Sequence, residues 1–197
     1  MDRVCVFIDG SNFYFGLKRN NRVTRVDYYQ LSQALVGPDR QLVRTYYYNV
    51  AYDRNLFPEK AKNQMSFLDS LDRTPYLDLR LGRLIPTSDG GFQERGVDIL
   101  MAADMLYYAA RKVYDTAIVV TEDGDFFPLL ENVKGLGAHV EIAAFLDSPS
   151  RDLLRAADVF IPLDAVLDKN GAKIFPPDSG DNRGNTVEPG AMNRNMR

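Results

Sequence analysis

The chain has 197 residues, a formal net charge of −3 and a hydrophobic fraction of 45%. This length and composition are typical of one globular domain with a sizeable core. Every apolar run is shorter than the roughly 18 residues that span a bilayer, and the start, "MDRVCVFIDG", does not resemble a signal peptide. The single cysteine, Cys5, cannot form an internal disulfide, which is typical of a reducing compartment. We therefore expect a cytoplasmic protein without a membrane segment.

Apolar strand-like runs alternate with longer helical stretches, the pattern of a mostly parallel sheet with helices on both faces. In chain order, the first half predicts a strand at Val4–Ile8, a helix from Ser11 or Asn12 to Arg19, a helix at Asp27–Leu35, a strand at Leu42–Tyr52, a helix at Pro58–Leu71 and a strand at Leu77–Ile85. A loop rich in turn formers, "PTSDGGF", follows the last of these strands.

The second half continues the alternation. It predicts a long helix at Val97–Tyr114, a strand at Ala117–Val120, a helix at Phe126–Leu136, a strand at His139–Phe145, a helix at Pro149–Ala156 and a short strand in "VFIPL". From Asp168 onward the chain is rich in Gly, Pro and Asn and has few apolar residues after Phe175, so it cannot bury enough surface to become ordered. We expect one domain over residues 1–167 and a flexible tail over 168–197.

Acidic residues are predicted to gather at one edge of this sheet. In an open α/β sheet, the strand ends where the chain leaves for a helix lie on one edge, and ligands bind there. Asp9 ends the first strand, and Asp123 and Asp125 follow the strand Ala117–Val120. Asp98 begins the long helix, which runs antiparallel to the next strand, so its start is level with the same edge.

Electrostatics constrains such a cluster. Two carboxylates about 4 Å apart repel by roughly 4 kcal/mol at an effective dielectric constant near 20. Four of them must therefore lie apart, have raised pKa values or hold a cation. Oxygen ligands favour Mg²⁺ or Mn²⁺ over zinc, since His139 begins a later strand and Cys5 lies within a strand. In the alternative, each acid satisfies backbone N–H groups at a turn or helix start.

Three segments resemble the NYN domain, in the LabA-like branch of the PIN-like nucleases: "VFIDGSNFY", "RGVDILMAADML" and "TEDGDFFPLLENVKGLGAHVEI". The resemblance extends from about Val4 to Phe145 in the same order. It implies a three-layer α/β/α sandwich, PIN-like or Rossmann-like, with a central and mostly parallel sheet of about six strands. It also implies an aspartate cluster that binds Mg²⁺ or Mn²⁺ and an endoribonuclease that hydrolyses RNA phosphodiester bonds.

The resemblance also assigns roles by position. The implied metal ligands, which are also catalytic, are Asp9, Asp98, Asp123 and Asp125. Asn12 and Thr121 match polar residues that orient the cluster or the phosphate. Glu122 departs from the family pattern, because a glycine usually occupies its position. Asp104, six residues after Asp98, is predicted to point elsewhere on the helix as a buried, hydrogen-bonded carboxylate.

The partners are less constrained by the sequence. RNA phosphates are predicted to contact the basic stretch Lys18, Arg19, Arg22 and Arg25, together with Arg95; the alternative is a solvated loop. A net charge of −3 is not typical of a nucleic-acid binder. The sequence leaves the oligomeric state open, with a homodimer as one alternative.

Two other functions are alternatives to the nuclease. One is a catalytically weak module that binds RNA or a protein and regulates gene expression. The other is a phosphotransfer domain. It is disfavoured because Ser11 stands where the haloacid-dehalogenase type needs a second aspartate, and because Asp9 lacks the adjacent acid of receiver domains.

Overall fold

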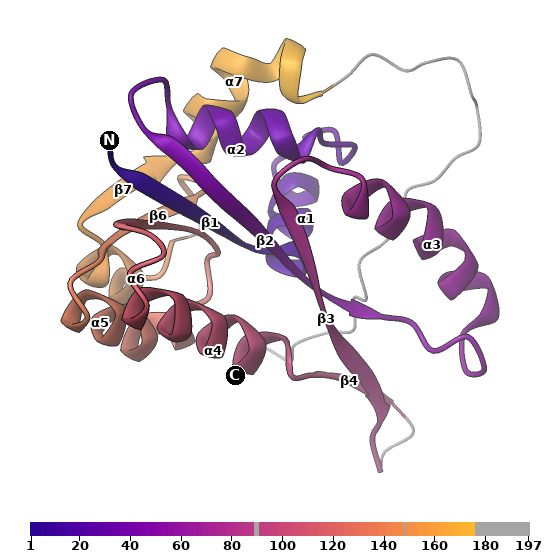
Figure 1. The fold of residues 1–197 in the computed structure, drawn as a ribbon. Helices are drawn as coiled ribbons and strands as arrows, with labels where there is room; N and C mark the ends of the chain where they lie inside the picture. The colour runs from indigo at the N-terminus through magenta and orange to yellow at the C-terminus, as the bar shows by residue number, and fades with distance from the viewer. Residues whose placement is uncertain (89–90, 148, 176–197) are drawn as a thin grey trace.

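A seven-stranded sheet forms the centre of the molecule in a computed structural model that describes residues 1–88, 91–147 and 149–175. Its strands are β1 (Arg3–Asp9), β2 (Gln41–Ala51), β3 (Leu77–Pro86), β4 (Phe92–Arg95), β5 (Thr116–Val120), β6 (His139–Ala144) and β7 (Val159–Pro162). They are arranged in the order β4-β3-β2-β1-β5-β6-β7 (Figure 1). Every neighbouring pair is parallel except β3 and β4.

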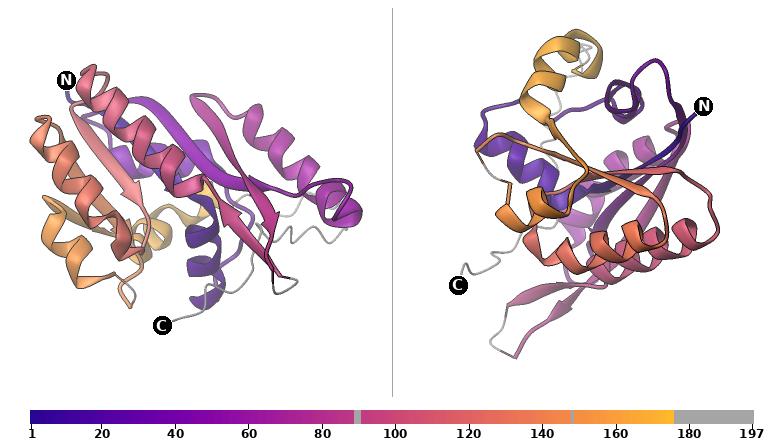
Figure 2. Two further views of the ribbon diagram at one scale, coloured as in Figure 1. Left: turned by 90° about the horizontal axis from the view of Figure 1, so that it is seen from below. Right: turned by 90° about the vertical axis from the view of Figure 1, so that its left-hand side faces the viewer.

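Helices cover both faces of the sheet (Figure 2). They are α1 (Gly10–Arg19), α2 (Tyr28–Val36), α3 (Pro58–Asp72), α4 (Val97–Ala110), α5 (Phe127–Gly135), α6 (Arg151–Ala156) and α7 (Leu163–Ile174). Apolar residues of α4, α5 and α6 pack into one core, and those of α1, α2, α3 and α7 pack into the other. The predicted α/β sandwich is confirmed. None of the described helices has the length and apolarity that crossing a membrane requires.

The central strand β1 separates the two cores. Val4, Val6 and Ile8 belong to one core, whereas Cys5 and Phe7 belong to the other. All five side chains are fully buried. Because both faces of this strand are covered, its sequence is continuously apolar rather than alternating.

The strand β4 and the end of α4 differ from the sequence prediction. β4 is four residues long and pairs antiparallel with β3, and it lies where only a loop and a helix start were expected. A short edge strand has little apolar pattern by which to recognise it. Helix α4 ends at Ala110 rather than Tyr114, and Lys112 follows with a positive φ of 53°, a conformation that an α-helix does not contain.

The helix α7 corrects the boundary expected at Asp168. It continues to Ile174, whose side chain is fully buried and whose carbonyl accepts a 2.8 Å hydrogen bond from the Asp27 amide. Residues 168–174 therefore belong to the domain and not to a tail. Asn170 and Gly171 have low helix propensity, so the sequence does not predict the helix. The packing of Leu163 and Leu167 in the core stabilises it. The rest of the expected tail, residues 176–197, lies outside the described residues.

Candidate active site

Asp9 lies at the carboxyl end of the central strand. Its side chain caps α1, with Oδ1 accepting a hydrogen bond from the Asn12 amide at 3.0 Å. The register of β1 and β5 pairs Ile8 with Val120. The next residues along are Asp9, the last residue of β1, and Thr121, which directly follows β5. Asp9 is only 3% exposed. The prediction that β1 ends in an acid at this edge is borne out in its backbone position.

The loop after β5 is organised by its own polar side chains. Thr121 is 1% exposed, and its hydroxyl oxygen accepts a hydrogen bond from the Asp123 amide at 3.2 Å. Asp123 in turn accepts from the Asp125 amide at 3.0 Å and caps the short 3-10 turn η1 (Gly124–Phe126). Asp125 is exposed. One oxygen of Asp123 therefore caps a helical turn, which is the alternative role that the sequence left open for these acids.

A side chain joins the two strand ends. Asn12 Oδ1 accepts a hydrogen bond from the Glu122 amide at 3.0 Å, which ties the first turn of α1 to the loop after β5. The Glu122 carboxylate turns toward α1, where Oε2 accepts from Arg19 at 2.6 Å. Its Oε1 is buried and has no hydrogen-bond partner among the described residues. Glu122, which stands where the family usually has a glycine, therefore places its negative charge against α1.

Asp98, the fourth predicted ligand, belongs to a separate helix. It lies in the first turn of α4 and is exposed. The helix cap is Gly96, in a left-handed conformation with φ of 89°, and no side chain bonds to the cap. The alternative in which Asp98 serves as the N-cap is therefore wrong, although its charge still complements the positive end of the helix dipole.

Glu94 is an acid that the sequence prediction missed. It lies on β4, and its Oε1 accepts a hydrogen bond from the Ser11 hydroxyl at 3.4 Å, next to the cap of α1. This contact brings the β3–β4 hairpin to the start of α1. The sequence could have indicated Glu94 by its position four residues before Asp98 in "ERGVD". It was missed because β4, the strand that carries it, was not predicted.

The oxygen donors at this edge suit a hard divalent cation by type, because no histidine or free cysteine accompanies them. However, among the described residues no three His, Cys, Asp or Glu side chains lie close enough together to hold a metal ion. Asp9 and Asp123 each use one oxygen to cap a helical turn. Metal ligation by Asp9, Asp98, Asp123 and Asp125 therefore stays a prediction.

Buried tyrosines lie beneath the start of α1. A Cβ atom on Gly10 would lie 2.5 Å from Tyr47 Cζ, so the backbone there rests directly on the ring. The Tyr28 hydroxyl donates to the Tyr47 hydroxyl at 3.4 Å. Burial raises the pKa of Tyr47 well above its ordinary value and raises the pKa of Tyr28 to about 12. Both phenols therefore stay neutral at physiological pH.

Two residues of the predicted basic stretch, Arg19 and Arg22, pair with acids of this chain. Arg19 contacts Glu122 at 2.6 Å and Asp147 at 3.8 Å. Arg22 pairs with Asp164 at 3.7 Å and also with Asp168. These pairs reduce the charge that Arg19 and Arg22 can offer to a phosphate.

The remaining predicted phosphate contacts are Lys18, Arg25 and Arg95. Lys18 Nζ lies 4.9 Å from the centre of the Tyr14 ring, and Arg25 is exposed. Arg95 is exposed and lies opposite Arg83 in the hairpin. A role for any of these residues in RNA binding stays a prediction.

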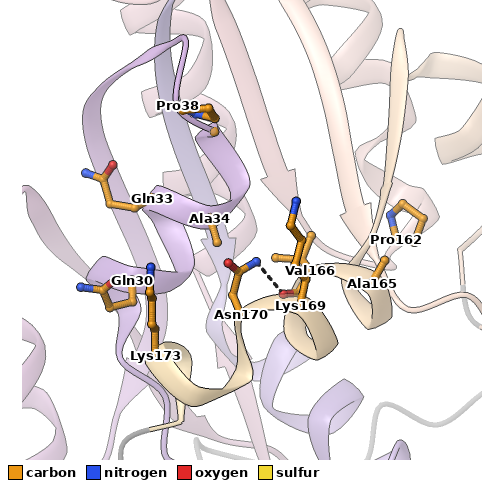
Figure 3. Close-up of a pocket in the computed structure, with 11 residues that line it drawn as sticks. Gln30, Gln33, Ala34, Pro38, Pro162, Ala165, Val166, Lys169, Asn170 and Lys173 are labelled. Carbon is orange, nitrogen blue, oxygen red and sulfur yellow. Dashed lines mark hydrogen bonds between the residues drawn. The ribbon is translucent and has the colours of Figure 1, made fainter.

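A groove between α2 and α7 lies apart from these residues (Figure 3). It has a volume of about 550 Å³ and is lined by polar side chains such as Gln30, Gln33, Lys169 and Lys173. Within it, Asn170 Nδ2 donates to the Val166 carbonyl at 2.9 Å. No predicted site residue lines this groove.

Comparison with known proteins gives matches over most of the chain. The model of the NYN domain matches residues 3–164. The low amplitude and bright protein LabA of Synechococcus elongatus is 26% identical over 171 residues, which cover 83% of this chain and 85% of LabA. A crystal structure of a Vibrio parahaemolyticus protein of unknown function superposes with a TM-score of 0.67 at 21% identity. That match covers 84% of this chain and 94% of the other, and it shows the fold alone.

Proposed function

Because this chain belongs to the NYN domain family, within the PIN-like nuclease superfamily, we propose that it hydrolyses RNA phosphodiester bonds with a divalent cation bound at the β1–β5 edge. One observation carries the proposal: a hydrogen bond from the Glu122 amide to Asn12 joins the loop after β5 to the helix that begins at the end of β1. Asp9 caps α1, and Asn12 holds the Glu122 amide. Such a linkage fixes the spacing between acids that are far apart in the chain.

Each side chain has a distinct role in this proposal. Mg²⁺ or Mn²⁺ would be held by the carboxylates Asp9, Asp98, Asp123 and Asp125. When bound, such an ion supplies Lewis-acid polarisation of the scissile phosphate and lowers the pKa of a water ligand. Thr121 is buried and orients the Asp123 backbone.

Proton transfer and the local charge involve Asp125, one of these four carboxylates, and Glu122. Asp125 is exposed, so its carboxylate is accessible to take up the proton of the attacking water. The Glu122 charge is offset by Arg19, which lessens its repulsion of a phosphate. A bulky residue at this family glycine is therefore compatible with RNA binding.

The test is cleavage of single-stranded and structured RNA with added Mn²⁺, comparing the wild-type chain with Asp9→Asn. We expect Asp9→Asn to lower the rate about a hundredfold or more, since a bound metal contributes several kcal/mol and each 1.36 kcal/mol is tenfold. Asparagine is also a good N-cap, so the thermal midpoint should change little.

The chain offers a matched control for this variant. Asp27 caps α2 by accepting from the Gln30 amide at 3.0 Å, as Asp9 caps α1, but it is not one of the predicted metal ligands. Asp27→Asn should keep wild-type activity. Equal cleavage by Asp9→Asn and the wild type, at matched purity, would contradict the proposal.

A regulatory module that binds RNA or a protein, with little catalysis, is the second candidate. It is favoured by the separation of the carboxylates, because no three of them gather among the described residues. Fluorescence anisotropy with labelled RNA, run beside the cleavage assay, separates the two functions. Binding of RNA without turnover in Mn²⁺ would favour this second candidate.

A further inference from the structure

The groove between α2 and α7 has the size of a small-molecule site. Its volume of about 550 Å³ lies within the range of about 300–1,000 Å³ that is typical of ligand pockets. The lining residues come from both helices (Figure 3). On α7 they include Val166, Lys169 and Lys173, and on α2 they include Gln30 and Gln33. Intervals of three and four residues place each set on one face of its helix.

Helix α7 carries its opposite charges on two different sides. Asp164 and Asp168 pair with Arg22, whereas Lys169 and Lys173 line the groove. The two lysines are one helical turn apart, so their Cβ atoms lie roughly 5–6 Å from each other. Within the part of the chain that the structure describes, neither lysine side chain forms an ion pair or a hydrogen bond, and no Asp or Glu lines the groove. The groove therefore presents two positive charges that the described residues do not neutralise.

Amide side chains supply the other polar groups of the groove. Gln30 and Gln33 are half-buried, and their side chains bond to no other described residue. Each carries both donors and an acceptor. The Nδ2 of Asn170 already donates to the Val166 carbonyl at 2.9 Å, which leaves its Oδ1 as an acceptor. This mixture of donors and acceptors matches the hydrogen-bonding edge of a nucleobase or a sugar.

We propose that this groove binds a nucleoside diphosphate or triphosphate. Lys169 and Lys173 contact its phosphates, since two ammonium groups one turn apart match two neighbouring phosphates better than a single carboxylate. Gln30 and Gln33 face the nucleoside. An RNA strand is a poorer occupant, because its charge continues at both ends, whereas the basic charge here is confined to two residues. No predicted metal ligand lines the groove, so this site does not rest on the proposed function.

Isothermal titration calorimetry of the full chain with ADP and with GDP tests the proposal. EDTA in the buffer removes divalent cations, so that nucleotide phosphates cannot bind through a metal at the carboxylate edge. We expect one nucleotide per chain. Lys169→Gln and Lys173→Gln should each raise the dissociation constant about tenfold, because each removes a charge-assisted hydrogen bond to phosphate. Both side chains are exposed, so circular dichroism should show an unchanged fold.

Lys62 provides the matched control. It is an exposed lysine of α3 that does not line the groove, so Lys62→Gln should bind nucleotide like the wild type. The conservative change Lys169→Arg keeps the charge and should also keep the affinity. If neither nucleotide bound at millimolar concentration, or if the double variant Lys169→Gln and Lys173→Gln bound as the wild type does, the proposal would be overturned.

Pyrophosphate as a second probe separates the phosphate contact from the nucleoside contact. We expect pyrophosphate to bind more weakly than ADP, and Gln30→Ala combined with Gln33→Ala to weaken ADP without affecting pyrophosphate. Pyrophosphate that bound as tightly as ADP would contradict the nucleoside contact. Fluorescence anisotropy with labelled RNA is the last comparison. A double lysine variant that lost RNA binding but kept nucleotide binding would assign the groove to RNA instead.

Discussion

Gly10 joins the central strand to the first helix, and the ring of Tyr47 fills the space beside it. The ring is fully buried, and its hydroxyl meets that of Tyr28. The aromatic packing beneath α1 therefore sets the distance between the start of this helix and the sheet. The positions of Asp9 and Asn12 depend on that distance.

We expect Gly10→Ala to destabilise the protein. The new Cβ would lie 2.5 to 2.6 Å from three atoms of Tyr47, and overpacking of this kind costs about 1–3 kcal/mol. The free energy of unfolding in urea measures the loss. Gly135→Ala is the control, since its Cβ would meet nothing within 4 Å and alanine favours a helix by up to about 1 kcal/mol. Equal stability of Gly10→Ala and the wild type would refute this account.

At the scale of single residues, the sequence predicts which acids lie at the edge but not what their side chains contact. A strand end and a helix start are local patterns, so the sequence alone predicts that Asp9 and Asp123 lie at the ends of strands. The contact of Glu94 with Ser11 spans 83 residues and that of Glu122 with Arg19 spans 103. Such contacts depend on tertiary packing, which no local pattern specifies.

At the scale of elements, α4 is held on the sheet by a polar contact beneath its middle turn. Asp104 accepts hydrogen bonds from the Tyr48 hydroxyl and from Arg80 Nε, both at 3.0 Å. Arg80 also donates to the Tyr108 hydroxyl at 3.2 Å. The hydrogen-bonded role predicted for Asp104 is confirmed, although the side chain keeps 22% exposure.

We expect Asp104→Asn to lower the free energy of unfolding by about 1–3 kcal/mol, because the partly buried Arg80 guanidinium loses its nearer carboxylate and keeps only Asp78, at 3.6 Å. Urea denaturation measures the change. Asp152→Asn is the matched control. Asp152 pairs with Arg155 at 3.8 Å on an exposed surface, where an ion pair contributes about 0–1 kcal/mol. The explanation fails if the two substitutions cost the same.

Two elements were missed in part because their stabilisation is not local. The strand β4 forms through pairing with β3, and Phe92 is the only apolar residue among its four. The last turns of α7 form because Ile174 packs in the core beside α2. The strands β1 and β5, in contrast, can be predicted from the sequence. Both faces of each strand are buried, so each is a continuous run of mostly apolar residues.

At the scale of the whole molecule, α7 closes one of the two cores. Leu163, Leu167 and Ile174 are each at most 2% exposed. A fully buried side chain of this size contributes about 1.5–3 kcal/mol. Together they match a large part of the roughly 5–15 kcal/mol by which a domain is stable.

Removal of everything after Pro162 should therefore lower the thermal midpoint sharply or prevent folding. Circular dichroism melting curves measure the effect. A chain ending after Phe175 keeps α7 whole and should melt like the full chain. If the shorter chain melted at the wild-type temperature, α7 would be dispensable for the core.

The hydrogen bond from the Glu122 amide to Asn12 spans 110 residues, and this separation affects how the protein is made. A ribosome delivers Asn12 early and Glu122 only after more than half of the chain has been synthesised. Until β5 emerges and pairs with β1, the two acidic segments have nothing to hold them together. A nascent chain that stalls before that point would therefore lack the edge at which the proposed metal site would form.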